Sequence, residues 1–293
     1  MNEFKTYHPI VNLIYFIFVI GFSMFFMNPI CLLVSFLCGL VYSVMLNVTK
    51  KHTLIYMFPL FLIMALINPL FNHGGATILA YFPNGNPLTL ESMVYGIAAA
   101  GMLLSVIFWF SCWNEIMTSD KFIYLFGKII PSMSLVFSMT LRFIPKFTSQ
   151  LKTVSKTQKS LGRADLGKSI IKRAKYGLTI LSIMVTWSLE NAIETADSKK
   201  ARGYGLPGRT AFSIFTFDKR DMKMFLFITI TGLYTLIGSL SGSIGFVYFP
   251  SIKPAEISVY GISVEISYLL LCICPIITEI WEAEKWKKLK SKI

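Results

Sequence analysis

One segment of the chain matches a nucleotide-binding pattern. Residues 162–169, with Lys168 before Ser169, satisfy G-x-x-x-x-G-K-[ST], the loop whose backbone amides hold nucleotide phosphates. Phosphate binding by this loop requires a buried strand that leads into it and a helix that leaves it. Residues 152–161 are instead polar and compatible with a helix, without a run of Val, Ile or Phe. We therefore predict that this segment does not bind nucleotide.

The other residue types that carry chemistry are scattered along the chain. The three histidines, His8, His52 and His73, lie far apart in sequence and have no carboxylate partner nearby. The five cysteines fall within apolar runs and lack the C-x-x-C spacing of zinc sites. We therefore expect no metal site, no disulfide framework, no cofactor and no catalytic centre.

One arginine stands at a predicted helix end. In residues 190–208, acidic side chains occupy the earlier turns, basic ones the last turn, and Gly203 follows, which is the pattern of a helix C-terminus. Arg202, next to the small Ala201, either complements the helix dipole or enters a groove on a partner and pairs bidentately with its carboxylates. Composition alone leaves both interpretations open.

The composition places these residues in a membrane protein. The chain of 293 residues is 54% hydrophobic and 15% charged, with a mean hydropathy of +0.62, whereas water-soluble domains contain about 25% charged residues. Its net charge is +13. Nucleic-acid binding is one explanation of such an excess, and the positive-inside rule of membrane proteins is another. The apolar composition favours the second, so we expect no nucleic-acid partner.

Six apolar runs approach or reach the length of about 20 residues that a membrane helix needs. They are residues 10–27, 30–46, 53–71, 92–113, 224–249 and 262–281. Lys and Arg flank these runs at alternate ends, which predicts a multi-pass cell-membrane protein with both termini in the cytoplasm. The tail, residues 282–293, combines Trp286 with a lysine cluster and should anchor at the cytoplasmic headgroups.

Most of the positive charge lies between the fourth and fifth apolar runs. Residues 141–223 contain seventeen basic and six acidic residues, a net charge of +11. Two apolar stretches in this region, residues 129–143 and 176–189, are too short and too closely flanked by charge to be membrane spans. They predict long amphipathic helices at the membrane boundary. The expected fold class is all-α: a polytopic membrane protein of about six transmembrane helices, plus long helices on the cytoplasmic side.

Three short motifs resemble those of a known family. In chain order they are residues 138–145 with Arg142 and Pro145, the triplet Ala201-Arg202-Gly203, and residues 208–210 with Arg209. Their order and spacing are similar to those of the transmembrane T component of energy-coupling factor (ECF) transporters, the family that includes the cobalt-transport permease. Together with the multi-span N-terminal half, the resemblance extends over most of the chain.

The resemblance implies a scaffold that is not an enzyme. Two ABC ATPase subunits would bind at its cytoplasmic side, and a small substrate-binding S component would bind alongside it in the lipid membrane, for uptake of a vitamin or a metal ion. The implied division is residues 1–113, with transmembrane helices 1–4; residues 114–223, the coupling-helix region; and residues 224–293, with the C-terminal transmembrane helices and the basic tail.

Members of this family couple to their ATPases through two Ala-Arg-Gly motifs at the ends of crossed helices. The second motif is intact as Ala201-Arg202-Gly203. The first falls at Ser160-Leu161-Gly162-Arg163, so that Leu161 occupies the arginine position and Arg163 lies two residues further on. Either Arg163 substitutes for the missing arginine, or this end docks without an ion pair. Arg142, Pro145 and Arg209 are expected to be structural or coupling residues.

Two other functions fit the sequence less well. A stand-alone membrane carrier usually keeps an ionisable residue within its spans, and the first five runs contain no Asp, Glu, Lys or Arg. A membrane-embedded enzyme acting on lipid phosphates could use Arg142, Arg163 and Lys168, but it would need clustered Asp or His. The sequence does not identify the substrate, the stoichiometry, the number of C-terminal spans, or whether the S component is dedicated or shared.

Overall fold

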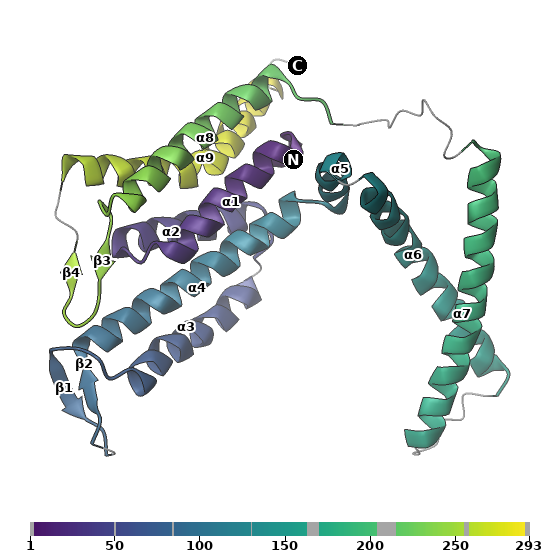
Figure 1. Cartoon of the computed structure of the whole chain (residues 1–293), viewed down its shortest axis with the longest axis horizontal. Helices are drawn as coiled ribbons and strands as arrows, with labels where there is room; N and C mark the ends of the chain where they lie inside the picture. The colour runs from purple at the N-terminus through teal and green to yellow at the C-terminus, as the bar shows by residue number, and fades with distance from the viewer. Residues whose placement is uncertain are drawn as a thin grey trace. The chain divides into compact units, whose positions relative to one another are not determined.

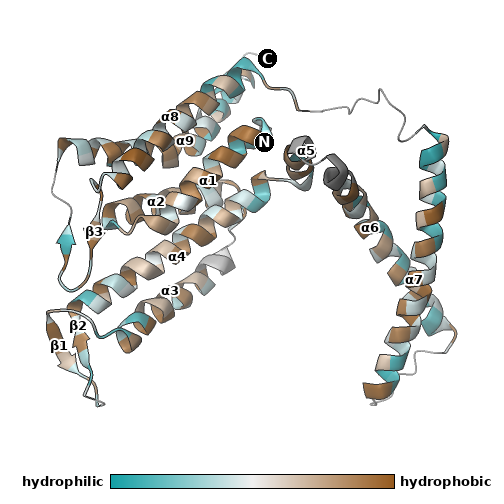
Figure 2. Ribbon diagram, in the orientation of Figure 1, coloured by the Kyte–Doolittle hydropathy of each residue, from teal (hydrophilic) through white to brown (hydrophobic). Residues whose placement is uncertain are grey.

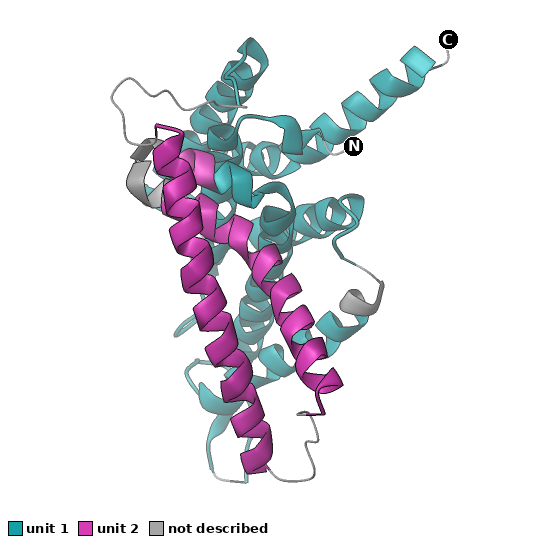
Figure 3. Cartoon of the chain, turned by 90° about the vertical axis from the view of Figure 1, so that its right-hand side faces the viewer, with its two compact units in different colours: residues 1–122, 215–293 teal, residues 123–214 magenta. Residues whose placement is uncertain are grey.

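A computed structural model describes residues 3–49, 51–83, 85–129, 131–162, 170–203, 215–254 and 258–290 (Figure 1). These residues form nine α-helices and two short β-hairpins. The chain divides into two compact units (Figure 3): unit 1 contains residues 1–122 and 215–293, and unit 2 contains residues 123–214. The expected all-α class is confirmed. The functional division at residues 113 and 223 stays a prediction.

The N-terminal half of unit 1 is a run of helices that begin at defined caps. They are the 3-10 helix η1 (Phe4–Thr6), then α1 (Pro9–Phe25), α2 (Pro29–Met45), α3 (Lys51–Phe71) and α4 (Leu90–Ile116). Both α1 and α2 start with proline, whose missing N–H is not needed at a first helical position. The Asn28 side chain caps α2 by accepting a 2.9 Å hydrogen bond from the amide of Ile30.

Between α3 and α4 the chain forms an antiparallel hairpin of β1 (Ile78–Tyr81) and β2 (Pro87–Thr89). A second antiparallel hairpin, β3 (Phe246–Val247) with β4 (Lys253–Pro254), connects α8 (Lys219–Leu240) to α9 (Val259–Lys290). The sequence prediction of a fifth apolar span reaching residue 249 is wrong at its C-terminal end. The helix stops at Leu240, because Gly242 turns the chain with a φ of +78° and the hairpin follows.

Six helical segments of unit 1 fall where the sequence predicts membrane spans. Among the described residues, α4, α8 and α9 are long and apolar enough to cross a membrane, and α1, α2 and residues Ile55–Phe71 of α3 are shorter apolar helices. Figure 2 shows hydrophobic residues along these helices. The chain is therefore a multi-pass membrane protein.

The core of unit 1 combines aromatic side chains with close helix contacts. Tyr15, Tyr42 and Trp109 are fully buried. The Trp109 indole donates a 3.0 Å hydrogen bond to the Ser35 hydroxyl, which links α4 to α2. A Cβ atom added to Gly232 would lie 2.7 Å from the ring of Phe18, so only glycine permits this approach of α8 to α1.

Unit 2 consists mainly of two long helices. They are α6 (Pro131–Ser160) and α7 (Ile170–Ala201), of 30 and 32 residues, and α5 (Ser119–Ile129) leads into them from unit 1. The two amphipathic stretches that the sequence predicts at residues 129–143 and 176–189 lie mostly within these helices. Both helices extend well beyond those stretches: α6 continues through Pro145 to Ser160, and α7 runs from Ile170 to Ala201.

Candidate functional site

The candidate site is the pair of long helices in unit 2 and the two ends that they present. The helices α6 and α7 cross in antiparallel order, as the magenta ribbons of Figure 3 show. From one end of the contact to the other, the pairs are Ser155 with Tyr176 (3.3 Å hydrogen bond), Phe147 with Trp187 (5.3 Å between ring centroids), Lys146 with Asn191 (3.0 Å) and Met139 with Lys199 (2.6 Å). These contacts fix the register of one helix on the other.

The register places the C-terminal ends of α6 and α7 far apart. Continuing the pairing of Met139 with Lys199 by about one turn puts Arg202 level with about residue 136 of α6. About 25 residues of helix then separate this level from Leu161, which is roughly 38 Å at a rise of 1.5 Å per residue. The two ends can therefore contact two different subunits at the same time.

Both ends have the same backbone geometry. Gly162 follows Leu161 with a φ of +70°, and Gly203 follows Arg202 with a φ of +72°. The Gly162 amide donates to the Lys159 carbonyl at 3.0 Å, and the Gly203 amide donates to the Lys200 carbonyl at 2.9 Å. This left-handed glycine cap ends many helices, and it leaves the preceding side chain at the tip. Both helices end where the sequence analysis expects, at residue 202 from the glycine pattern and at residues 160–163 from the resemblance, and the coupling role of these ends stays a prediction.

The side chains at the two tips differ. Leu161 is 62% exposed, and Ser160 and Gly162 beside it are exposed. Ala201 and Arg202 are exposed and Gly203 is half-buried. Among the residues that the structure describes, Arg202 makes no ion pair. One tip therefore offers an apolar side chain, and the other offers a guanidinium with small neighbours.

The remaining sequence-predicted site residues do not join these tips. Arg142 is exposed near the middle of α6, and Pro145 lies one turn further along the same helix. The proline removes one backbone donor from the helix. Arg163 and Arg209 lie outside the described residues, so their predicted roles stay predictions.

The structure shows the apolar surface of the two helices that the sequence predicts to be amphipathic. On α7, every third or fourth residue is an exposed apolar side chain, at 51% to 64% exposure: Leu178, Leu181, Val185, Leu189 and Ile193. On α6, Val136, Ile144 and Leu151 are also about half exposed. On α7 the spacing of three or four residues agrees with the amphipathic helix that the sequence predicts at residues 176–189. Contiguous exposed apolar surface of this kind is typical of a partner or membrane contact.

Unit 1 also contains an apolar hollow of about 570 Å³ between α2, α3 and α4. Its lining includes Leu33, Phe36, Phe61, Ala98 and Gly101. No charged side chain is among the described residues that line it. This lining offers shape and apolar contact.

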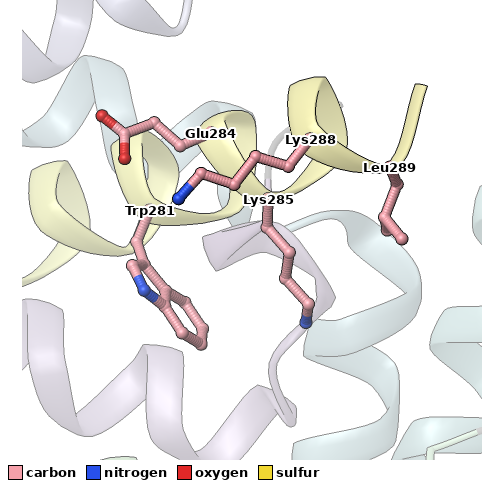
Figure 4. Close-up of a pocket in the computed structure, with 5 residues that line it drawn as sticks. All are labelled: Trp281, Glu284, Lys285, Lys288 and Leu289. Carbon is pink, nitrogen blue, oxygen red and sulfur yellow. The ribbon is translucent and has the colours of Figure 1, made fainter. Parts of the chain in front are cut away.

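A smaller hollow of about 240 Å³ lies along the C-terminal part of α9 (Figure 4). Lys285 lies 5.4 Å from the centroid of the Trp281 ring and 3.5 Å from a Glu282 carboxylate oxygen. The lining alternates aromatic, acidic and basic side chains at the surface, without a buried polar group. Such a surface suits the predicted anchoring at lipid headgroups, which stays a prediction.

The described residues around the phosphate-loop match and the scattered histidines and cysteines can be compared with what nucleotide and metal sites need. The segment before Gly162 is helix α6, not the strand that a phosphate loop requires, and residues 163–169 lie outside the described part of the chain. Within the described ranges, no three His, Cys, Asp or Glu side chains converge on a metal-sized site.

These features define a multi-pass helical membrane protein. Between its helices α4 and α8 the chain forms a crossed pair of long helices with exposed tips. No family model matches the chain. It is 32% identical over 111 residues to the energy-coupling factor transporter transmembrane protein EcfT of Lactobacillus helveticus. The aligned segment covers 37% of this chain and 40% of that relative.

Two further relatives carry the same name. The EcfT of Brevibacillus brevis is 33% identical over 99 residues, or 32% of this chain and 37% of the relative. The EcfT of Leuconostoc gelidum is 27% identical over 100 residues, or 34% of this chain and 37% of the relative. Each match spans about two fifths of the relative's length. The three matches confirm the likeness to the T component of ECF transporters that the motifs predict.

Proposed function

We propose that this chain is the transmembrane scaffold of an ECF-type ABC importer. It couples ATP hydrolysis by two ATPase subunits to reorientation of a substrate-binding S component during uptake of a vitamin or metal ion. One observation carries the proposal: α6 and α7 each end in an exposed tip closed by a left-handed glycine, at the two positions where the resemblance places the coupling motifs.

The Arg202 tip docks by charge. Its guanidinium stands at the end of a helix whose last turn also carries Lys199 and Lys200, so this end attracts an acidic groove. Arginine offers a planar fork of donors that pairs with a carboxylate through two hydrogen bonds. The small Ala201 and Gly203 on either side leave room for the walls of such a groove.

The Leu161 tip docks by apolar burial. A leucine that is 62% exposed contributes part of the about 1.5–3 kcal/mol available from burying such a side chain fully. Of the two alternatives left open by the sequence, this exposure favours docking without an ion pair over replacement by Arg163. The two tips then engage two ATPase subunits through different chemistry.

The apolar stripe on α7 is the proposed S-component surface. Leu181, Val185 and Leu189 lie on the same helix as the Arg202 tip. A displacement of this tip when the ATPase pair closes therefore moves the stripe with it, and the contacts between α6 and α7 transmit a displacement of the Leu161 tip to the same stripe. This arrangement requires unit 2 and both termini to lie on the cytoplasmic side, as the charge distribution predicts.

Purification of the tagged full-length chain from its native membrane tests this function. We expect two ATPase subunits and a small hydrophobic protein to co-purify in fixed proportion, and we expect the co-purified S component to identify the substrate class. A stand-alone carrier or a lipid-modifying enzyme would purify without ATPases, and that result would exclude the proposal.

A further inference from the structure

The N-terminal segment, residues 3–8, lies against helices α1, α2, α4, α8 and α9 of unit 1 and the first turn of α5, and we name it the brace. Its anchor is Phe4, which is fully buried. The Phe4 ring packs edge-on against Tyr15 of α1 at 5.0 Å and against Tyr42 of α2 at 6.4 Å between centroids. The Phe4 amide donates a 3.2 Å hydrogen bond to the Glu279 carboxylate of α9. Phe4 therefore fixes the brace to helices α1, α2 and α9.

One side of the brace holds the point where the chain leaves unit 1, which is after Phe122. The Lys5 ammonium lies 2.8 Å from the Glu115 carboxylate, at the end of α4. The Lys121 ammonium, in the first turn of α5, donates to the Lys5 carbonyl at 2.5 Å. The Asn12 amide, oriented so that both of its polar atoms are paired, accepts from Lys121 at 2.7 Å. We call residues 115–122 the first crossing.

The other side of the brace holds the point where the chain returns to unit 1, at Phe215. The Arg220 guanidinium donates to the Thr6 hydroxyl at 2.9 Å and lies 4.5 Å from the centroid of the Tyr7 ring. The His8 amide donates to one Asp221 oxygen at 3.2 Å, and the other Asp221 oxygen accepts from the Asp218 amide at 3.1 Å, which caps α8. We call residues 217–222 the second crossing.

We propose that the brace ties the two crossings together, so that loosening one crossing loosens the other. Adjacent residues of a single short segment bond to both: Lys5 to the first crossing, and Thr6, Tyr7 and His8 to the second. Charge-assisted hydrogen bonds stabilise each attachment, while the buried Phe4 ring keeps the segment from sliding.

The use of this device rests on the proposed function. Unit 2 is joined to unit 1 only through these two crossings along the chain. Because the brace joins the two crossings, a force that unit 2 exerts on one crossing is transmitted to the other. Without the brace, local unfolding at the first affected crossing would absorb that force. Lys5, Phe4 and Arg220 are thus positioning residues for coupling, and they are not themselves docking residues.

Amide hydrogen exchange on the purified full chain in lipid nanodiscs tests the brace without any partner. The reporter of the first crossing is the Phe122 amide, which donates to the Thr118 carbonyl at 3.1 Å. The reporter of the second is the Met222 amide, which donates to the Asp218 carbonyl at 3.0 Å. Each variant is read at the crossing that it does not touch.

We expect Arg220→Gln to accelerate exchange of the Phe122 amide, and Lys121→Met to accelerate exchange of the Met222 amide. Each effect should be about three- to tenfold, which lies in the lower part of the range of coupling energies between residues in one hydrogen-bond network. Lys253→Gln removes a positive charge from an exposed residue of the β3–β4 hairpin and should leave both amides unchanged. Unchanged remote amides in both brace variants would overturn the proposal. Arg202→Glu, which addresses the proposed function, should alter neither amide, so the two ideas fail separately.

Discussion

The ammonium of Lys121 lies 2.5 Å from the backbone carbonyl oxygen of Lys5, although 116 positions separate the two residues in the chain. Lys121 is only 4% exposed. Burial lowers the pKa of Lys121 to about 8, and the positive charge of Lys5 contributes to the shift. A hydrogen bond between the start of α5 and the N-terminal brace therefore depends on a lysine that titrates near physiological pH.

The first prediction concerns the pH dependence of stability. The pKa of Lys121 is depressed from 10.5 in its unfolded reference to about 8 in the folded chain. Between these values the unfolded chain binds more protons, so the free energy of unfolding rises with pH across this window and the contribution is lost as pH falls toward 8. Melting curves of the wild type and of Lys121→Arg at pH 7.5, 9 and 10 measure it.

We expect the wild type to gain stability relative to Lys121→Arg as the pH rises, because arginine keeps its charge throughout this range. A constant difference between the two proteins at all three pH values would show that Lys121 does not titrate in this window.

The second prediction concerns the ion pair between Lys5 and Glu115. Both side chains are partly exposed, at 34% and 44%, so the pair contributes less than about 1 kcal/mol. Lys5→Glu should lower the melting temperature slightly by placing like charges together, and Lys5→Glu with Glu115→Lys should restore it. A double-mutant cycle measures the coupling. If the change in unfolding free energy of the double variant equals the sum of the changes in the two single variants, the pair does not contribute to the brace.

The third prediction concerns the glycine that ends α7. Gly203 has a φ of +72°, and an alanine there costs about 1–2 kcal/mol. Gly203→Ala should therefore destabilise the last turn and weaken ATPase binding. Gly177→Ala provides a matched control in the same helix, because an added Cβ meets nothing within 4 Å and alanine favours a helix interior by about 1 kcal/mol. Equal effects of the two changes on binding would contradict the cap.

The fourth prediction separates the two alternatives at the end of α6. If Leu161 docks by apolar burial, Leu161→Asp should release one ATPase subunit, whereas Arg163→Ala should leave both bound. Quantitative analysis of the subunits in the purified complex measures this outcome. Loss of a subunit from Arg163→Ala, with retention by Leu161→Asp, would assign the contact to Arg163.

The sequence predicts much of this fold because its signals are local. Apolar runs locate the helices of unit 1, and Gly203 after a basic turn correctly ends α7 beside Arg202. The end of α8 at Leu240 was missed because the apolar run continues through the Gly242 turn into β3. The identity of both tips follows from resemblance, and their separation follows only from the register of α6 on α7.

The brace could not be predicted from sequence. Its bonds join residues that are 110 to 275 positions apart, such as Lys5 with Glu115 and Phe4 with Glu279. From the sequence alone, Lys5 indicates only the orientation of the first apolar helix in the membrane. The capping pair of Asp218 and Asp221 was readable as a helix start, but its second bond to the His8 amide depends on the tertiary fold.

The central claim is that the exposed guanidinium of Arg202 couples this chain to an ATPase subunit, and charge reversal tests it most directly. In membranes that contain all partners, tagged Arg202→Glu should insert at the wild-type level and retain about 30-fold less of one ATPase, because losing one partner of a hydrogen-bonded charge pair costs 2 kcal/mol or more. Lys253→Glu, the same charge change at an exposed hairpin residue, should retain both ATPases. Wild-type ATPase retention and uptake by Arg202→Glu would contradict the account.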